Sequence, residues 1–179
     1  MKKCVVIFVL LTIVVLWVPA QEIKTDFSSP GEIVFGLAEI TPAWALGGFF
    51  QYMKFPWAIP IGGGRANYLG FGGNIASYYC FSESRLYFSG KALFEGRFTV
   101  SSTFALDAET GLGFIAADIG TGFIGTLGLA PRFQVNPNLT ARIFVGIDFA
   151  GNPAYDASDF DSKQFISYFR LNVGIVKKL

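Results

Sequence analysis

Alternating apolar and polar residues predict two strands in Thr126–Phe149, one on each side of the turn sequence Asn136–Leu139. Successive side chains of a strand point to opposite faces, so period-two alternation across a turn predicts a β-hairpin. One face of this hairpin is apolar, whereas the other carries Arg132, Arg142 and Asp148. The apolar face therefore needs either a protein core or lipid to cover it.

The segment Arg85–Val100 alternates over an unusually long stretch. Seven of the eight residues on one of its faces carry a polar group. The other face is a stripe without polar side chains, made of Leu86, Phe88, Gly90, Ala92, Phe94, Gly96, Phe98 and Val100. At about 3.3 Å per residue, such a strand spans roughly 50 Å. It is longer than the roughly 9–11 residues that a tilted transmembrane strand needs.

Five further strands bring the predicted total to eight, namely Glu32–Ile40, Trp44–Phe55, Asn67–Phe81, Thr103–Ala117 and Gln164–Val176. Pro56–Arg65 and Asp118–Gly122 are predicted as Gly-containing connections, and Ala150–Lys163 as a long polar loop. An even strand count is expected of a bacterial single-chain barrel. The predicted fold is all-β, a single eight-stranded antiparallel up-and-down transmembrane β-barrel.

Connection lengths also predict an orientation. If both termini are periplasmic, the turns at Ser101–Ser102 and Asn136–Leu139 are periplasmic, and Ala150–Lys163 is an extracellular loop. Short periplasmic turns and longer extracellular loops are the rule for such barrels. Two connections do not fit this rule, because the short Thr41–Ala43 connection would be extracellular and the long Pro56–Arg65 connection would lie in the periplasm.

The chain begins with the features of an exported protein. Met1–Lys3 is basic, Val5–Val18 is a 14-residue apolar run, and small residues end at Ala20. This combination predicts a signal peptide that is cleaved after Ala20, and the alternative is an uncleaved anchor. The apolar run is shorter than the roughly 20 residues of a membrane helix. The predicted organisation is a signal peptide over residues 1–20, a polar lead-in over 21–31 and a barrel domain over 32–179.

Composition narrows the classes of partner and architecture. Without residues 1–20, 159 residues remain, and the loss of two of 14 basic residues leaves 12 against 13 acidic ones, a net charge of −1. This balance gives no electrostatic basis for nucleic-acid binding. Cys80 is the only cysteine of the mature chain, so no intramolecular disulfide is expected. No apolar run after the signal peptide approaches a spanning helix, and the remaining membrane architecture is a closed β-barrel.

The sequence contains no histidine. This absence excludes Ser-His-Asp and Cys-His catalytic arrangements and removes the commonest metal ligand. We therefore expect neither an enzyme nor a cofactor. Asp156, Asp159 and Asp161 in the long loop offer oxygen ligands for Ca²⁺, but the segment lacks the Gly and distal Glu of an EF-hand loop. Solvated acidic side chains are the favoured interpretation of this segment.

Charged residues recur on the polar faces of the predicted strands. The interior of an eight-stranded barrel is just filled by side chains, and buried charges must be paired. We therefore predict a structural salt-bridge network in the lumen, and the alternative is a narrow polar pathway for ions or small solutes. The candidate network residues are Arg85, Lys91, Glu95, Arg97, Asp107, Glu109, Arg132, Arg142, Asp148 and Arg170.

These features resemble the small bacterial outer-membrane β-barrels of the OmpA/OmpX type. The resemblance covers about Glu32–Leu179 and rests on the signal peptide, the alternation and the short Asn/Pro turns. The segment from Pro131 through Asn136–Leu139 to Asp148 resembles the penultimate hairpins of such barrels. The last strand differs, because it ends in Lys177–Leu179 and not in the aromatic residue that the family's assembly machinery reads.

The resemblance implies a location in a bacterial outer membrane and a mainly structural or surface-interaction role. Its implied partners are membrane lipid, the outer-membrane assembly machinery, and an extracellular ligand or host surface. A narrow porin-like channel is one alternative. A soluble exported carrier of small ligands with a lipocalin-like barrel is another, with Phe88, Phe94 and Phe98 facing a cavity and Arg85–Arg97 exposed. Alternation alone does not decide, because it does not identify the medium at each face.

Overall fold

The described chain is all-β. The computed structural model describes residues 31–41, 45–62, 65–118, 120–136, 139–151 and 165–179. The predicted signal peptide, the lead-in up to residue 30 and most of the long loop lie outside these residues. The eight strands are β1 (Gly31–Thr41), β2 (Ala45–Gly62), β3 (Arg65–Cys80), β4 (Arg85–Thr99), β5 (Phe104–Ala117), β6 (Gly120–Asn136), β7 (Leu139–Gly151) and β8 (Phe165–Lys178).

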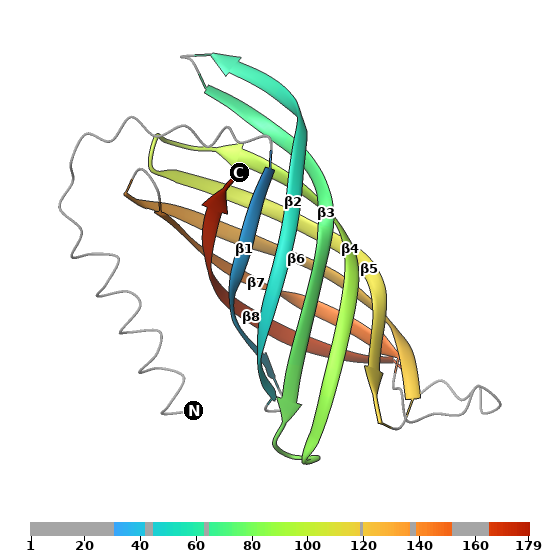
Figure 1. Ribbon diagram of the computed structural model, residues 1–179. Coiled ribbons are helices and arrows are strands. Elements are labelled where there is room, and N and C mark those ends of the chain that lie inside the picture. The colour runs from blue at the N-terminus through green and yellow to red at the C-terminus, as the bar shows by residue number, and fades with distance from the viewer. Residues whose placement is uncertain (1–30, 42–44, 63–64, 119, 137–138, 152–164) are drawn as a thin grey trace.

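The strands form one antiparallel sheet that closes on itself (Figure 1). Each strand pairs with its neighbours along the chain, and β1 also pairs with β8, for example Val34 with Val176. Pairing at both ends of the strand order removes the free edges that an open sheet would expose. Among the described residues, no helix is long and apolar enough to cross a membrane.

The ring closes with a stagger. Starting at Gly31 and moving from partner to partner around the sheet, the register returns to β1 at Thr41 and not at Gly31, a displacement of ten residues. A closed sheet with such a displacement has strands tilted against its axis. The intermediate partners are Lys54, Phe71, Phe94, Thr110, Leu127, Ile147 and Phe169.

All eight predicted strands are present, but the prediction of a connection at Pro56–Arg65 was wrong. β2 continues to Gly62 and β3 begins at Arg65, so residues 63–64 alone connect them. The cause is a bulge, a shift of register between Lys54 and Trp57 in the pairing with β3. A bulge accommodates Pro56, which has no backbone N–H to donate.

The bulge also preserves the two faces of the sheet. It adds one residue to β2, so Phe55 is buried while Trp57, two positions later, is half exposed and packs near Phe71 with ring centroids 6.0 Å apart. Beyond the bulge β2 pairs only with β3, and this hairpin extends past the ring (Figure 1). The Pro- and Gly-rich composition of the segment therefore belongs to a projecting hairpin and not to a loop.

The other strand bounds differ from the predicted ones by a few residues. The first strand begins at Gly31, within the predicted lead-in, and the last continues to Lys178. β6 begins at Gly120, within the predicted connection Asp118–Gly122. Gly120 has a φ of 144°, a backbone conformation that residues other than glycine rarely adopt.

The apolar stripes of the strands face outward. Phe88, Phe94 and Phe98 are 52%, 46% and 49% exposed. The residues that alternate with this stripe point into the ring, and Lys91 and Glu95 among them are at most 4% exposed. The interior of the described residues therefore holds buried charges together with apolar clusters, while the exterior is largely apolar, which is unusual for a water-soluble domain.

Glycines on the inner face allow the strands to approach closely. A Cβ atom added at Gly47 would overlap the carbonyl oxygen of Ser77 on β3, whereas at Gly48 the nearest atom would be 3.7 Å away. We expect Gly47→Ala to lower the free energy of unfolding by about 1–3 kcal/mol, because backbone must shift. Gly48→Ala should change it by less than about 1 kcal/mol. Urea unfolding of the two refolded variants measures both values, and equal effects would contradict the packing.

Candidate functional site

Ten charged side chains fill the middle of the ring. Each is at most 4% exposed, and among the described residues five are cations and five are anions, so their formal charges cancel. They come from β1 and from each of the strands β4, β5, β6, β7 and β8. The cations are Lys91, Arg97, Arg132, Arg142 and Arg170, and the anions are Glu32, Glu95, Asp107, Glu109 and Asp148.

Two carboxylates lie at the centre of this cluster and share the same three arginines. Glu95 accepts from Arg142 at 2.9 Å, from Arg132 at 3.1 Å and from Arg97 at 3.2 Å. Asp107 accepts from Arg97 at 3.1 Å and Arg142 at 3.5 Å, and it also pairs with Arg132. Guanidinium groups present several donors in one plane, so a single arginine can bridge two carboxylates.

Several of these pairs cross the interior. Glu32 on β1 accepts from Arg97 on β4 at 2.9 Å and pairs with Arg132 on β6. Gln51 on β2 donates to Glu109 on β5 at 3.1 Å. In each of these contacts the two strands that it joins, β1 and β4, β1 and β6, or β2 and β5, are not neighbours in the ring. The polar side chains therefore bridge the lumen from wall to wall.

A second group continues the cluster toward the end of the ring that holds the turn at residues 81–84. Glu109 pairs with Arg142 at 2.7 Å and with Arg170 at 3.2 Å. Asp148 pairs with Lys91 at 3.2 Å and with Arg170 at 3.4 Å. Glu109 and Arg170 thus link the central carboxylates to Asp148 in one continuous network.

Aromatic rings hold two of the guanidinium groups. The guanidinium carbon of Arg170 lies 4.1 Å from the ring centroid of Phe144, and that of Arg97 lies 4.0 Å from the centroid of Phe55. Phe144 is fully buried, and its contact with Arg170 accounts for an aromatic ring in the middle of the charged cluster. Cation–π contacts stabilise a guanidinium where water is excluded.

Nine of the ten sequence-predicted residues lie in this network, and Arg85 lies apart from it. The Arg85 side chain is 28% exposed and pairs with Asp118 at 2.7 Å and Glu83 at 3.6 Å. Its position explains the difference, because it is the first residue of β4 and lies at the rim. Alternation places a residue on a face but does not indicate its depth.

Sequence reasoning missed Glu32 and Gln51. Glu32 alternates with Ile33 and Phe35 on the first strand, a signal that places it on the inner face. Gln51 lies on β2, where aromatic residues occupy both faces and weaken the alternation. Both residues are 1% exposed and bind the predicted carboxylates or arginines.

The charged side chains of this network pair with one another and fill the interior of the ring. Each of its carboxylates is paired with at least one cation, and arginines do not release protons at physiological pH. Among the described residues, no group of three or more His, Cys, Asp or Glu is placed to hold a metal ion. The acidic loop residues Asp156, Asp159 and Asp161 lie outside the described residues.

Comparison with known proteins gives no further assignment. Protein-family models, curated proteins and solved structures were compared with this chain, and none of them matches it. The function must therefore be inferred from the chemistry of the two faces.

Proposed function

We propose that the protein is a transmembrane β-barrel of a bacterial outer membrane, similar to the OmpA/OmpX type, with a mainly structural or surface-interaction role. The observation that carries this proposal is the distribution of side chains between the two faces. Large apolar side chains such as Phe88 and Phe114 are more than half exposed, while ten charged side chains are buried. Lipid around the ring would cover the apolar face and leave the paired charges inside.

The closed sheet supports the same proposal. In hydrocarbon every backbone N–H and C=O group needs an internal partner, and a closed ring of strands supplies one. The strands have 11 to 18 residues. These lengths suit a tilted membrane strand, which needs about 9–11 residues.

The connections support the proposed orientation, with the chain termini at the periplasmic end. The connections at that end are short, namely residues 63–64, 100–103 and 137–138. The opposite end has the longest connection, residues 152–164, together with shorter ones at residues 42–44, 81–84 and 118–119. The bulge in β2 removes the long connection that conflicted with this orientation. Under this proposal the assembly machinery inserts the barrel, and the opposite end contacts an extracellular ligand or host surface.

Two alternatives have less support. A lipocalin-like carrier needs its apolar residues around a cavity, whereas in the described residues Phe94 and Phe98 point outward. A channel needs a continuous polar path, whereas the ion pairs of Glu32 and Glu95 bridge the lumen.

Membrane extraction tests the proposal. We expect the protein to fractionate with the outer membrane, to need detergent for extraction, and to migrate differently in electrophoresis before and after heating. The heat shift arises because a closed, ion-paired ring resists unfolding by detergent at room temperature. A protein that stays in the aqueous fraction without detergent, and shows no heat shift, would contradict the membrane proposal.

A further inference from the structure

We propose that the pocket at the end of the ring near turn 81–84 binds a primary alkylammonium group. This inference goes beyond the proposed membrane role, and it does not depend on that role, because the pocket opens at the end of the ring and not on its outer face. Under the proposed orientation this end faces the outside of the cell. The pocket lies next to Asp148, the last member of the ion-pair network.

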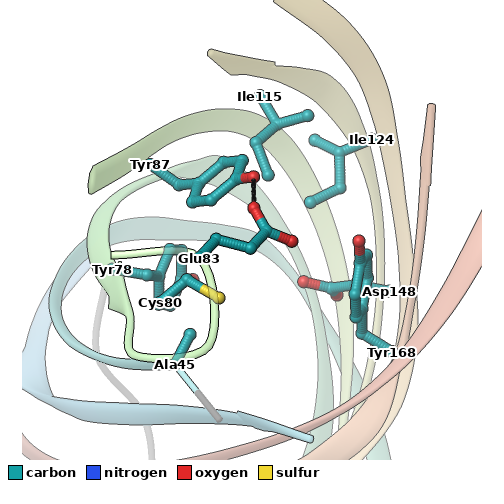
Figure 2. Close-up of a pocket in the computed structure, with 9 residues that line it drawn as sticks. All are labelled: Ala45, Tyr78, Cys80, Glu83, Tyr87, Ile115, Ile124, Asp148 and Tyr168. Atoms are coloured by element: carbon teal, nitrogen blue, oxygen red, sulfur yellow. Dashed lines mark hydrogen bonds between the residues drawn. The ribbon is translucent and has the colours of Figure 1, made fainter. Parts of the chain in front are cut away.

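Nine described residues line the pocket, which encloses a volume of about 30 Å³ (Figure 2). They come from β2 to β8 and from the turn after β3. Two are carboxylates and three are tyrosines, and none of these nine is Lys or Arg. The lining residues are Ala45, Tyr78, Cys80, Glu83, Tyr87, Ile115, Ile124, Asp148 and Tyr168.

Asp148 provides the observation that points to a ligand. Its Oδ2 atom pairs with Lys91 at 3.2 Å and with Arg170 at 3.4 Å. Its Oδ1 atom is buried and has no hydrogen-bond partner among the described residues. A buried carboxylate oxygen without a donor is costly, and native structures almost always supply one. A ligand with N–H donors would satisfy it.

Glu83 provides a second acceptor at the entrance. Its side chain is 47% exposed and accepts a hydrogen bond from the Tyr87 hydroxyl. Figure 2 shows the carboxylates of Glu83 and Asp148 both turned toward the pocket. An ammonium group carries three N–H donors and a positive charge, so it can donate to Asp148 Oδ1 and still has donors left for acceptors at the entrance.

The walls of the pocket select the size and shape of the cation. The rings of Tyr78, Tyr87 and Tyr168 suit a cation, which their π faces attract. Ile115 and Ile124 add an apolar wall for methylene groups. One water molecule needs roughly 10–15 Å³ of such space, so the pocket holds about two atoms of that size. The ammonium group and its first methylene group fit this space and the rest of a slender chain would extend out of it, whereas a trimethylammonium group is too wide.

A lysine side chain and a polyamine both end in a primary ammonium group on a chain of methylene groups. Calorimetric titration of the purified protein in detergent micelles, first with n-butylammonium, tests the shared chemistry. The neutral n-butanol and the anionic butyrate have the same chain length and serve as controls. Blocked lysine (N-acetyl-lysine N-methylamide) and spermidine then distinguish the two sources, because the tighter of the two identifies the natural class.

We expect saturable n-butylammonium binding that is at least about tenfold tighter than that of n-butanol, and no butyrate binding, since charge-assisted hydrogen bonds dominate. Glu83→Gln and Asp148→Asn should each weaken n-butylammonium at least about fivefold. Asp118→Asn removes the same charge from the same rim, outside the pocket, and should leave the affinity nearly unchanged. A circular-dichroism spectrum like that of the unchanged protein shows that each variant is folded, and Glu83→Gln tests the proposal if Asp148→Asn does not fold.

Three results would overturn the proposal. The first is equal affinity for n-butylammonium and n-butanol. The second is an equal loss of affinity for n-butylammonium in the folded Glu83→Gln and Asp118→Asn variants. The third is an absence of saturable binding, which would mean that the pocket holds water only. Each of these results is independent of whether the outer face contacts lipid.

Discussion

Replacing Asp107 by asparagine should lower the free energy of unfolding by about 3–5 kcal/mol, the cost typical of removing one partner of a buried ion pair. Asp107 is fully buried and pairs with Arg97, Arg132 and Arg142. An amide of the same size removes the negative charge and turns N–H donors toward groups that are themselves donors. Four anions would then face five cations in the interior.

Reversible urea unfolding in lipid vesicles, followed by tryptophan fluorescence, measures this effect. Asp118→Asn is the matched control, because the Asp118 side chain is 71% exposed and pairs with the rim residue Arg85. An exposed pair of this kind contributes at most about 1 kcal/mol. Similar losses of stability for Asp107→Asn and Asp118→Asn would show that the interior network is not a stabilising element.

Phe94→Arg should destabilise the folded protein in lipid vesicles by about 2–4 kcal/mol, because Phe94 lies on the outer face near the middle of β4 and an arginine there would enter hydrocarbon. Val100→Arg is the control. Val100 is similarly exposed, at 54%, but it follows the last residue of β4 at the end of the ring. Near an interface the same substitution costs about 0–1 kcal/mol.

Unfolding of the two variants in the same vesicles gives the difference directly. In water, an arginine in place of a half-exposed phenylalanine would cost little at either position. A negligible effect of Phe94→Arg would therefore contradict contact between this face and lipid, even if the protein were membrane-associated. A large effect at both positions would mean that the hydrocarbon layer of the membrane extends beyond the end of β4.

Much of the strand pattern could be predicted from the sequence, because alternation is a local property of two-residue period. The outward stripe from Leu86 to Phe98 and the inward charges Lys91, Glu95 and Arg97 follow from it. The bulge could not be predicted, because Pro56 and the glycines at residues 62–64 have the composition of a turn. A bulge is visible only when a strand is aligned with its partner.

The members of the ion-pair network were more predictable than its connections. Nine charged residues could be assigned to the interior from their faces alone. Their pairing depends on which strands face each other across the ring, and Arg132 reaches Glu32 across 100 positions of sequence. The pocket could not be predicted either, because its lining comes from seven strands and a turn whose positions depend on the stagger.

The position of Glu32 has a consequence for how the chain folds. It belongs to the first strand, yet it binds arginines on β4 and β6, and it reaches its place only when β1 meets β8. The strands between them can pair in sequence as neighbours, but the network lacks one of its five anions until the ring closes. Closure and completion of the ion pairs are therefore one event, which favours a cooperative transition dominated by contacts distant in sequence. Such transitions are slow, and this one is complete only when the first and last strands meet.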